Sequence, residues 1–258
     1  MICFSPANGF PPESYKQLFN QIDDSIVCPK VIPYTEYFSL KDQGQTWIDY
    51  SDRLIQEIQE LDRPIIGVGH SMGAILLLRA SCYLPHLFKK LVLIDPTFLP
   101  LWAIASLRLS PKAFSRKFIP IISKTYRRKD LWSSKDEAYQ DLRNKKLFRK
   151  FSEQSFQNYL SAALISNSDG NQTLRFSKQW EEHCFSTVIN PWKWLKQSNI
   201  PTLGIIGENS NVITDRIYKK WKAVGTKSKI KIIPNATHLV PLEMPFETSL
   251  LINDFINN

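Results

Sequence analysis

The chain contains little cysteine. Its 258 residues include only Cys3, Cys28, Cys82 and Cys184, with no C-x-x-C pair and no cluster with histidine at zinc-site spacing. This pattern argues against a disulfide framework and gives no support for a bound metal. We expect reduced, buried thiols, as in a cytoplasmic protein.

Long apolar runs are also missing. Residues 1–6 contain neither a basic stretch nor an apolar stretch long enough for a signal peptide or a membrane span. There are no internal repeats and no low-complexity tract. With 43% hydrophobic residues, the chain is long enough for one sizeable core and an inserted subdomain. We therefore expect a cytoplasmic protein with no membrane partner.

One stretch in the first third of the chain combines three local signals. An apolar run at residues 65–68, preceded by Pro64, predicts a short buried strand. It leads directly into Gly69-His70-Ser71-Met72-Gly73, which has the spacing G-x-S-x-G, and then into an apolar helix that ends before Pro85. A tight turn of this kind needs glycine on both sides of its strained central residue. We therefore expect the Ser71 hydroxyl to project above the sheet as a nucleophile.

This strand, turn and helix resemble the nucleophile elbow of the α/β-hydrolase fold family. The resemblance implies a mostly parallel sheet flanked by helices, formed by residues 1–97 and 198–258. Counting the strands that the sequence indicates gives about six, where the family commonly has eight. Residues 98–197 show no strand–helix alternation, and we expect them to form an inserted helical cap over the catalytic edge.

The remaining core elements follow from periodicity. Strands are expected near residues 1–5, 25–34, 90–94, 202–206 and 229–233, and helices near 46–61, 213–224 and 245–256. Thr46 and Asp49 predict a capping box at the first of these helices. Residues 37–40 stand where the family often has a Gly-His-Gly turn.

The resemblance implies a base and two oxyanion donors. His238 lies in the loop between the last strand and the last helix, where these hydrolases hold the histidine that accepts the serine proton. Asn8-Gly9-Phe10-Pro11 is similar to the family's His-Gly loop, with Asn in place of His. By that match the Phe10 and Met72 N–H groups hold the oxyanion. His70, inside the elbow, is expected to pack or to line the pocket.

The acid that orients the histidine is not evident from the motif. The family's usual acid belongs to a G-E-x-D pattern, and here Gly207-Glu208-Asn209-Ser210 places serine at that position. Some members of the family have their acid at the carboxyl end of the preceding strand, where this chain has Asp95. Asp95 is therefore our first choice for the acid that orients His238. Glu208, Asp215 or a dyad without any acid remain open.

The basic charge is concentrated in the expected cap. Residues 101–150 contain fourteen Lys and Arg against four Asp and Glu, a balance of +10, while the whole chain carries +9. Aromatic residues interleave with these cations. The segment is either a solvated surface or a landing site for something anionic, such as an acyl carrier protein or a coenzyme A moiety.

These features predict a serine hydrolase, similar to carboxylesterases and thioesterases, that forms an acyl-enzyme at Ser71. The expected substrate is a small acyl ester or thioester, and no cofactor is implied. A relative that cleaves a C–C bond or a peptide imide would look the same in sequence. The alternative is a non-catalytic binding module whose basic cap holds an acidic protein or, less expectedly, nucleic acid; the serine at position 210 favours it.

Overall fold

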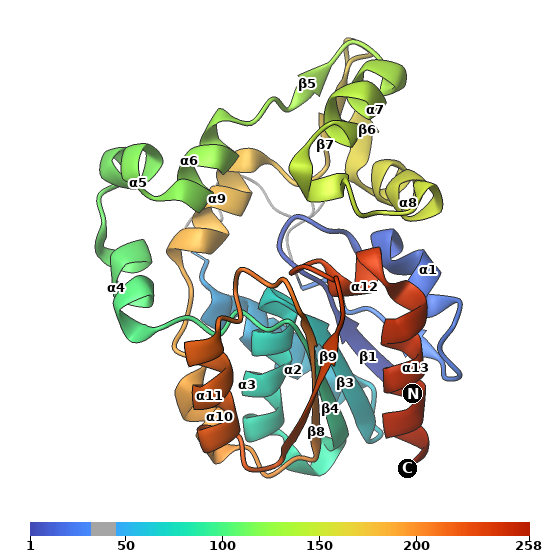
Figure 1. Ribbon diagram of the computed structural model, residues 1–258, viewed down its shortest axis with the longest axis vertical. Coiled ribbons are helices and arrows are strands. Elements are labelled where there is room, and N and C mark those ends of the chain that lie inside the picture. Colours follow the sequence, from blue (N-terminus) through green and yellow to red (C-terminus); the bar gives the residue numbers. More distant parts are fainter. Residues whose placement is uncertain (32–44) are drawn as a thin grey trace.

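The computed structural model describes residues 1–31 and 45–258. Six parallel strands form the main sheet in the order β2-β1-β3-β4-β8-β9 (Figure 1), which confirms the predicted fold class. The strands are β1 (Ile2–Ser5), β2 (Ile26–Val27), β3 (Ile65–His70), β4 (Phe88–Ile94), β8 (Thr202–Gly207) and β9 (Ser228–Ile233).

The central strands are apolar because helices cover both faces of the sheet. Every residue of β1, β3 and β8 is buried, as expected for parallel strands between two helical layers. The edge strand β9 instead exposes Lys229 and Lys231, and charges of this kind protect an open sheet edge from pairing with another chain.

Two helical layers enclose the sheet. One face packs against α2 (Trp47–Glu60), α3 (Met72–Tyr83), α10 (Trp192–Gln197) and α11 (Asp215–Val224), and the other against α1 (Lys16–Phe19) and α13 (Pro245–Asn257) (Figure 1). The short α12 (Val240–Glu243) precedes α13. Thr46 and Asp49 form the predicted capping box at the start of α2.

The second strand is shorter than the sequence pattern suggests. β2 includes only Ile26 and Val27, and it ends before Pro29, which has no N–H for the ladder. The last part of the predicted strand, residues 32–34, and the segment 37–40 lie outside the described residues.

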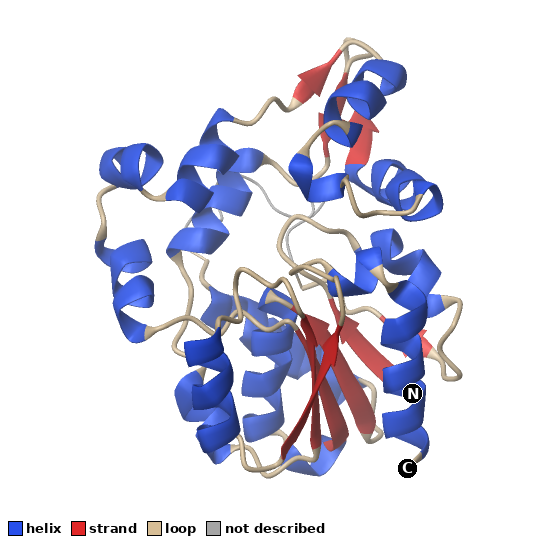
Figure 2. Cartoon of the chain, viewed as in Figure 1, coloured by secondary structure: helices blue, strands red, loops and turns tan. Residues whose placement is uncertain are grey.

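The middle of the chain lies over the carboxyl ends of the strands (Figures 1 and 2). It contains α4 (Leu101–Leu109), α5 (Lys112–Phe118), α6 (Pro120–Arg127), α7 (Lys135–Arg143), α8 (Glu153–Ala163) and α9 (Lys178–Ser186). It also contains a small antiparallel sheet that we did not predict, with β5 (Leu131–Trp132), β6 (Leu164–Ser166) and β7 (Gln172–Leu174) in the order β5-β7-β6.

Contacts join this cap to the core at several points. α8 packs on the 3₁₀ turn Pro12–Tyr15 and on α1, and the Lys150 ammonium donates to the Asn235 carbonyl in the loop that follows β9. The last helix of the middle segment, α10, packs with the core helices α3 and α11. Within the described part of the chain, no helix has the combination of length and apolar character that crossing a bilayer requires.

Candidate active site

The turn between β3 and α3 holds Ser71 in a strained conformation. Ser71 has φ +54° and ψ −114°, a region that residues with a Cβ rarely adopt. Its flanking glycines are required by space, because a Cβ on Gly69 would lie 2.6 Å from the Ala74 backbone and one on Gly73 would lie 2.1 Å from the Ser5 carbonyl oxygen. The turn therefore places the Ser71 side chain at the carboxyl edge of the sheet, beneath the cap.

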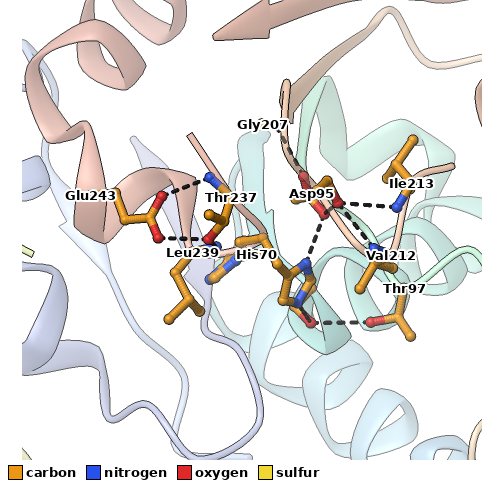
Figure 3. A network of polar contacts seen from close by, with 12 residues as sticks. His70, Asp95, Thr97, Gly207, Val212, Ile213, Thr237, Leu239 and Glu243 are labelled. Carbon is orange, nitrogen blue, oxygen red and sulfur yellow. Dashed lines mark hydrogen bonds and ion pairs between the residues drawn. The ribbon is translucent and has the colours of Figure 1, made fainter. Parts of the chain in front are cut away.

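Ser71, His238 and Asp95 lie in hydrogen-bond contact although they are far apart in sequence. Figure 3 shows the polar network around the labelled Asp95 and Thr97. Ser71 Oγ is 2.9 Å from His238 Nε2, and His238 Nδ1 donates to Asp95 Oδ1 over 2.7 Å. Asp95 has no exposed surface and Ser71 only 8%. The arrangement has the geometry of a nucleophile, a base and an acid that fixes the base.

Asp95 is held by donors from the neighbouring strand end. Its Oδ2 accepts from the Gly207 N–H at 3.0 Å, and its Oδ1 accepts from the Ser210 hydroxyl at 2.7 Å. The Ser210 oxygen in turn accepts from the N–H groups of Val212 and Ile213. A serine where the motif would have an acid thus becomes a donor to an acid on the adjacent strand, a role that sequence reasoning missed.

The other candidate acids lie elsewhere. Glu208 is exposed and accepts from the Asn235 N–H, and Asp215 is the first residue of α11. Among the described residues, neither carboxylate forms a hydrogen bond with His238. The contact to the imidazole belongs to Asp95, the first choice from the sequence.

The loop that contains His238 is fixed on both sides. Glu243 is buried, and its carboxylate accepts from the Thr237 N–H at 2.7 Å and from the Thr237 hydroxyl at 2.6 Å (Figure 3). From the opposite side, His70 Nε2 donates to the His238 carbonyl at 2.9 Å. These contacts restrict the backbone on either side of the base.

His70 is neutral in this network. Its Nε2 carries the proton given to the His238 carbonyl, so Nδ1 accepts from the Tyr15 hydroxyl at 2.8 Å; the Tyr15 oxygen accepts from the Ala7 N–H. Complete burial, together with the nearby His238, lowers the pKa of His70 to about 3. His70 therefore holds the Tyr15 and His238 segments together through its two ring nitrogens and does not serve as a second base.

This lowered pKa predicts a specific acid sensitivity. An unfolded chain binds a proton at His70 below about pH 6.5, whereas the folded protein does so only near pH 3. As the pH falls through this range, His70 should therefore lower the free energy of unfolding by about 1.4 kcal/mol per pH unit. His70→Asn cannot bind this proton. At pH 8 this variant should have a lower free energy of unfolding than wild type. The difference between the two free energies, measured by urea unfolding, should become smaller as the pH falls below 6.5. Parallel curves would contradict the prediction.

The matched control is Tyr15→Phe. This variant loses the hydroxyl that bonds to Nδ1 but keeps the buried imidazole, whose burial is the main cause of the lowered pKa. Its stability difference from wild type should stay nearly constant with pH.

A second hydroxyl that the sequence did not point to lies beside the nucleophile. Thr97 Oγ1 is 3.1 Å from Ser71 Oγ, and the Thr97 N–H donates to the Ser71 carbonyl. When the Ser71 hydroxyl donates to His238 Nε2, the Thr97 hydroxyl is oriented to donate to Ser71. The only local signal was its position two residues after Asp95, at the same strand end.

The two expected oxyanion donors differ in their settings. Met72 is the first residue of α3, so its N–H has no acceptor within the helix. The Phe10 N–H donates to the Ala7 carbonyl at 3.2 Å, a long hydrogen bond that an incoming oxyanion would have to share. Gly9, just before Phe10, has φ +79°, a backbone conformation that favours glycine.

A charge pair from the cap covers this oxyanion loop. The Glu181 carbonyl accepts from the Asn8 side chain at 3.2 Å, and the Glu181 carboxylate lies where a Gly9 Cβ would be 3.3 Å away. Arg128 pairs with this carboxylate at 2.5 Å. The ring centroids of Phe10 and Tyr159 are 5.3 Å apart, so α8 and α9 both reach the loop.

The described residues contain no cluster of three or more His, Cys, Asp or Glu side chains suited to a metal ion. The four cysteines carry free thiols, and Cys3 and Cys184 are buried. Burial raises the pKa of both of these thiols well above the ordinary range.

Comparison with known proteins places this site in context. A family model described as the alpha/beta hydrolase family matches residues 30–249. The type I acyl-CoA thioesterase mpaH of Penicillium brevicompactum is 27% identical over 148 residues, which cover 50% of this chain and 32% of that protein. This chain thus spans about a third of the length of that thioesterase.

Two further proteins match over most of the chain. The abhydrolase domain-containing protein ACTT2 of Alternaria alternata is 24% identical over 241 residues, which cover 76% of this chain and 84% of that protein. The solved structure of the peroxisomal alpha-beta-hydrolase Lpx1 from Saccharomyces cerevisiae superimposes with a TM-score of 0.77 at 18% identity, covering 99% of this chain and 76% of that one. At this identity the structural likeness is evidence for the fold alone.

Proposed function

This chain belongs to the alpha/beta hydrolase family, and from that premise we propose that it hydrolyses an acyl ester or thioester through an acyl-enzyme at Ser71. One observation supports the proposal most: the chain of contacts from Ser71 Oγ through the His238 imidazole to the buried Asp95 carboxylate, beneath a cap.

Each step of the proposed reaction uses one of these contacts. His238 Nε2 accepts the Ser71 proton while Oγ attacks the acyl carbon, and Asp95 keeps the other imidazole nitrogen protonated. The oxyanion accepts from the Met72 N–H and from the Phe10 N–H, which it shares with the Ala7 carbonyl. The imidazolium then gives its proton to the leaving alcohol or thiol. Water, activated by His238, attacks the acyl-enzyme and releases the acid.

We propose a coenzyme A or carrier-linked thioester as the substrate class. The support is the identity shared with acyl-CoA thioesterases over half of this chain, together with the +10 balance of residues 101–150. Anionic leaving groups of this kind would be attracted by a basic cap. The cytoplasm remains the proposed compartment, on the free thiols.

The binding-module alternative has lost one of its two supports. It rested on the basic cap and, to a smaller extent, on the serine at position 210, and in the structure Ser210 donates to the carboxylate that contacts His238.

The proposal is tested with a fluorophosphonate probe and a set of thioesters. Because a serine hydroxyl reacts with this probe only when a base activates it, wild-type protein should be labelled at Ser71. Acyl-CoA thioesters of increasing chain length should then be hydrolysed with release of free thiol, which a thiol reagent measures. Absence of both labelling and hydrolysis would refute the proposal. Labelling with turnover of neutral esters alone would retain the hydrolase and reject the thioester.

A further inference from the structure

The first three cap helices contain no acidic residue. Residues 101–129, which include α4, α5 and α6, carry eight Lys and Arg and no Asp or Glu. The positive charge of the cap is therefore concentrated in its first segment, where no acidic side chain offsets it. The helices follow one another along one side of the cap (Figure 1).

Large apolar side chains are exposed on the same helices. Trp102 is 70% and Leu109 is 81% exposed, although α4 is apolar along most of its length. Further exposed apolar residues of this stretch are Leu101, Phe114, Phe118 and Ile121. Large apolar side chains that stay exposed on neighbouring helices are candidates for an interaction site. We call residues 101–127 on this exposed side the α4–α6 face.

The opposite sides of these helices are already used. Ile104, Ile122 and Thr125 are buried, and α6 and α4 pack on α9. One cation of this stretch is also committed to α9, because Arg116 pairs with Glu182 through two nitrogens at 2.7 and 3.0 Å. Arg128, the residue after α6, pairs with Glu181 of α9.

The other cations of the face point to solvent. No ion pair within the described residues involves the exposed Arg108, Lys112, Lys117, Lys124 or Arg127. Cations and rings are mixed rather than separated, since the Lys117 ammonium lies 5.2 Å from the Phe118 ring centroid and that ring lies 4.7 Å from Phe114. The face is thus apolar and positive at once.

Chemistry decides which occupant fits. A second copy of this chain would bring two faces of the same sign together, which is unfavourable. Interfaces with proteins are depleted in lysine at their centre, and three of the five exposed cations here are lysines. Exposed Trp, Leu, Phe and Ile among lysines and arginines fit the boundary of an anionic bilayer, where apolar side chains enter the headgroup region and cations meet lipid phosphates and carboxylates.

We propose that the α4–α6 face docks the protein on an anionic membrane surface. The protein lies on the bilayer without crossing it, with Trp102 and Leu109 entering the headgroup region and the lysines at the lipid charges. This departs from our expectation of no membrane partner, and it does not depend on the reaction that the site performs.

The test is sedimentation of full-length protein with lipid vesicles. One set contains phosphatidylcholine alone, and the other also contains about 30 mol% phosphatidylserine. Wild type should bind the anionic vesicles at low salt, bind phosphatidylcholine at least tenfold more weakly, and release from the anionic vesicles as salt rises from about 0.05 to about 0.5 M.

Variants locate the binding face. Lys112→Gln, Lys117→Gln and Lys124→Gln combined should weaken partition about 100-fold, since each cation near an anionic surface contributes about fivefold. The charge-matched control changes three exposed lysines at the opposite, amino-terminal side of the sheet, Lys89, Lys196 and Lys227, to Gln, and should bind nearly as wild type does.

The apolar part needs its own pair of variants. Trp102→Ser with Leu109→Ser should weaken partition at least tenfold. Phe246→Ser with Leu250→Ser, at exposed positions of α13, is the control and should have little effect.

Three outcomes would overturn the proposal. The first is no binding to anionic vesicles at low salt, and the second is equal loss in the test and control variants. The third is vesicle binding that survives the lysine changes while binding to a purified acyl carrier protein is lost, which would assign the face to an acidic protein.

Discussion

Ser71→Ala is expected to abolish probe labelling and to lower ester or thioester turnover by about a million-fold. Without the hydroxyl there is no nucleophile for His238 to activate, and only binding and oxyanion contacts remain to assist water. Steady-state kinetics with an activated ester, on protein purified apart from any wild-type enzyme, measure the loss. Turnover near the wild-type rate would show that another group attacks the substrate.

Stability measurements separate this loss from misfolding. Ser71→Ala removes the hydroxyl that contacts His238 and Thr97 but no helix-capping bond, so the free energy of unfolding should fall by only about 1–2 kcal/mol and the variant should stay folded in the activity assay. Ser71→Gly is the sharper companion variant. Ser71→Gly also lacks the hydroxyl and should be equally inactive. Because glycine tolerates φ +54° and ψ −114°, this variant should be more stable than Ser71→Ala by about 1 kcal/mol, after the entropic cost of glycine.

The core could be predicted because its signals are local. The elbow needs only a strand, five residues and a helix in succession, and the structure has β3, the turn and α3 at those positions. The strand β8 and the helices α2 and α13 also follow the expected periodicity closely. β2 stops at Val27 because Pro29, two residues later, has no N–H for the ladder.

The cap could not be predicted in detail, because its elements are short and depend on distant partners. β5 has two residues and pairs with β7, about forty positions away, through a ladder that leaves no period in the sequence. The turn between β6 and β7 is held by the Asn167 side chain, which accepts from two later N–H groups. Such contacts depend on tertiary context, whereas periodicity reports only one face of one element.

The site divides in the same way. Ser71 and His238 are marked by their neighbours in sequence, so the structure places them where the pattern predicts, although their catalytic roles remain proposals. Thr97 and Tyr15 belong to no recognisable motif. They contact the site because the segment after β4 and the 3₁₀ turn Pro12–Tyr15 both lie beside the elbow. Whether Asp95, Glu208 or Asp215 contacts the base depends on how two strand ends and a loop meet in the tertiary structure, and no local pattern in the sequence shows this.

Asp95→Asn is expected to lower kcat by about 10⁴-fold. The Asp95 carboxylate accepts from His238 Nδ1 and so leaves Nε2 free to accept the Ser71 proton. An amide can donate to Nδ1 instead, which moves the imidazole proton to Nε2 and removes the base from the nucleophile. Pre-steady-state acylation by an activated ester measures this loss in the step where the proton is transferred.

Three companion variants decide whether this effect belongs to the acid itself. Glu208→Gln and Asp215→Asn should retain most of the activity, because neither carboxylate bonds to His238 within the described residues. Ser210→Ala removes one donor to Asp95 and should cost about tenfold, the effect of a single hydrogen bond of about 1.4 kcal/mol. A large loss at Glu208 or Asp215 with little loss at Asp95 would reassign the acid. Equal small losses at all three carboxylates would instead mean that His238 works without one, as a dyad with Ser71.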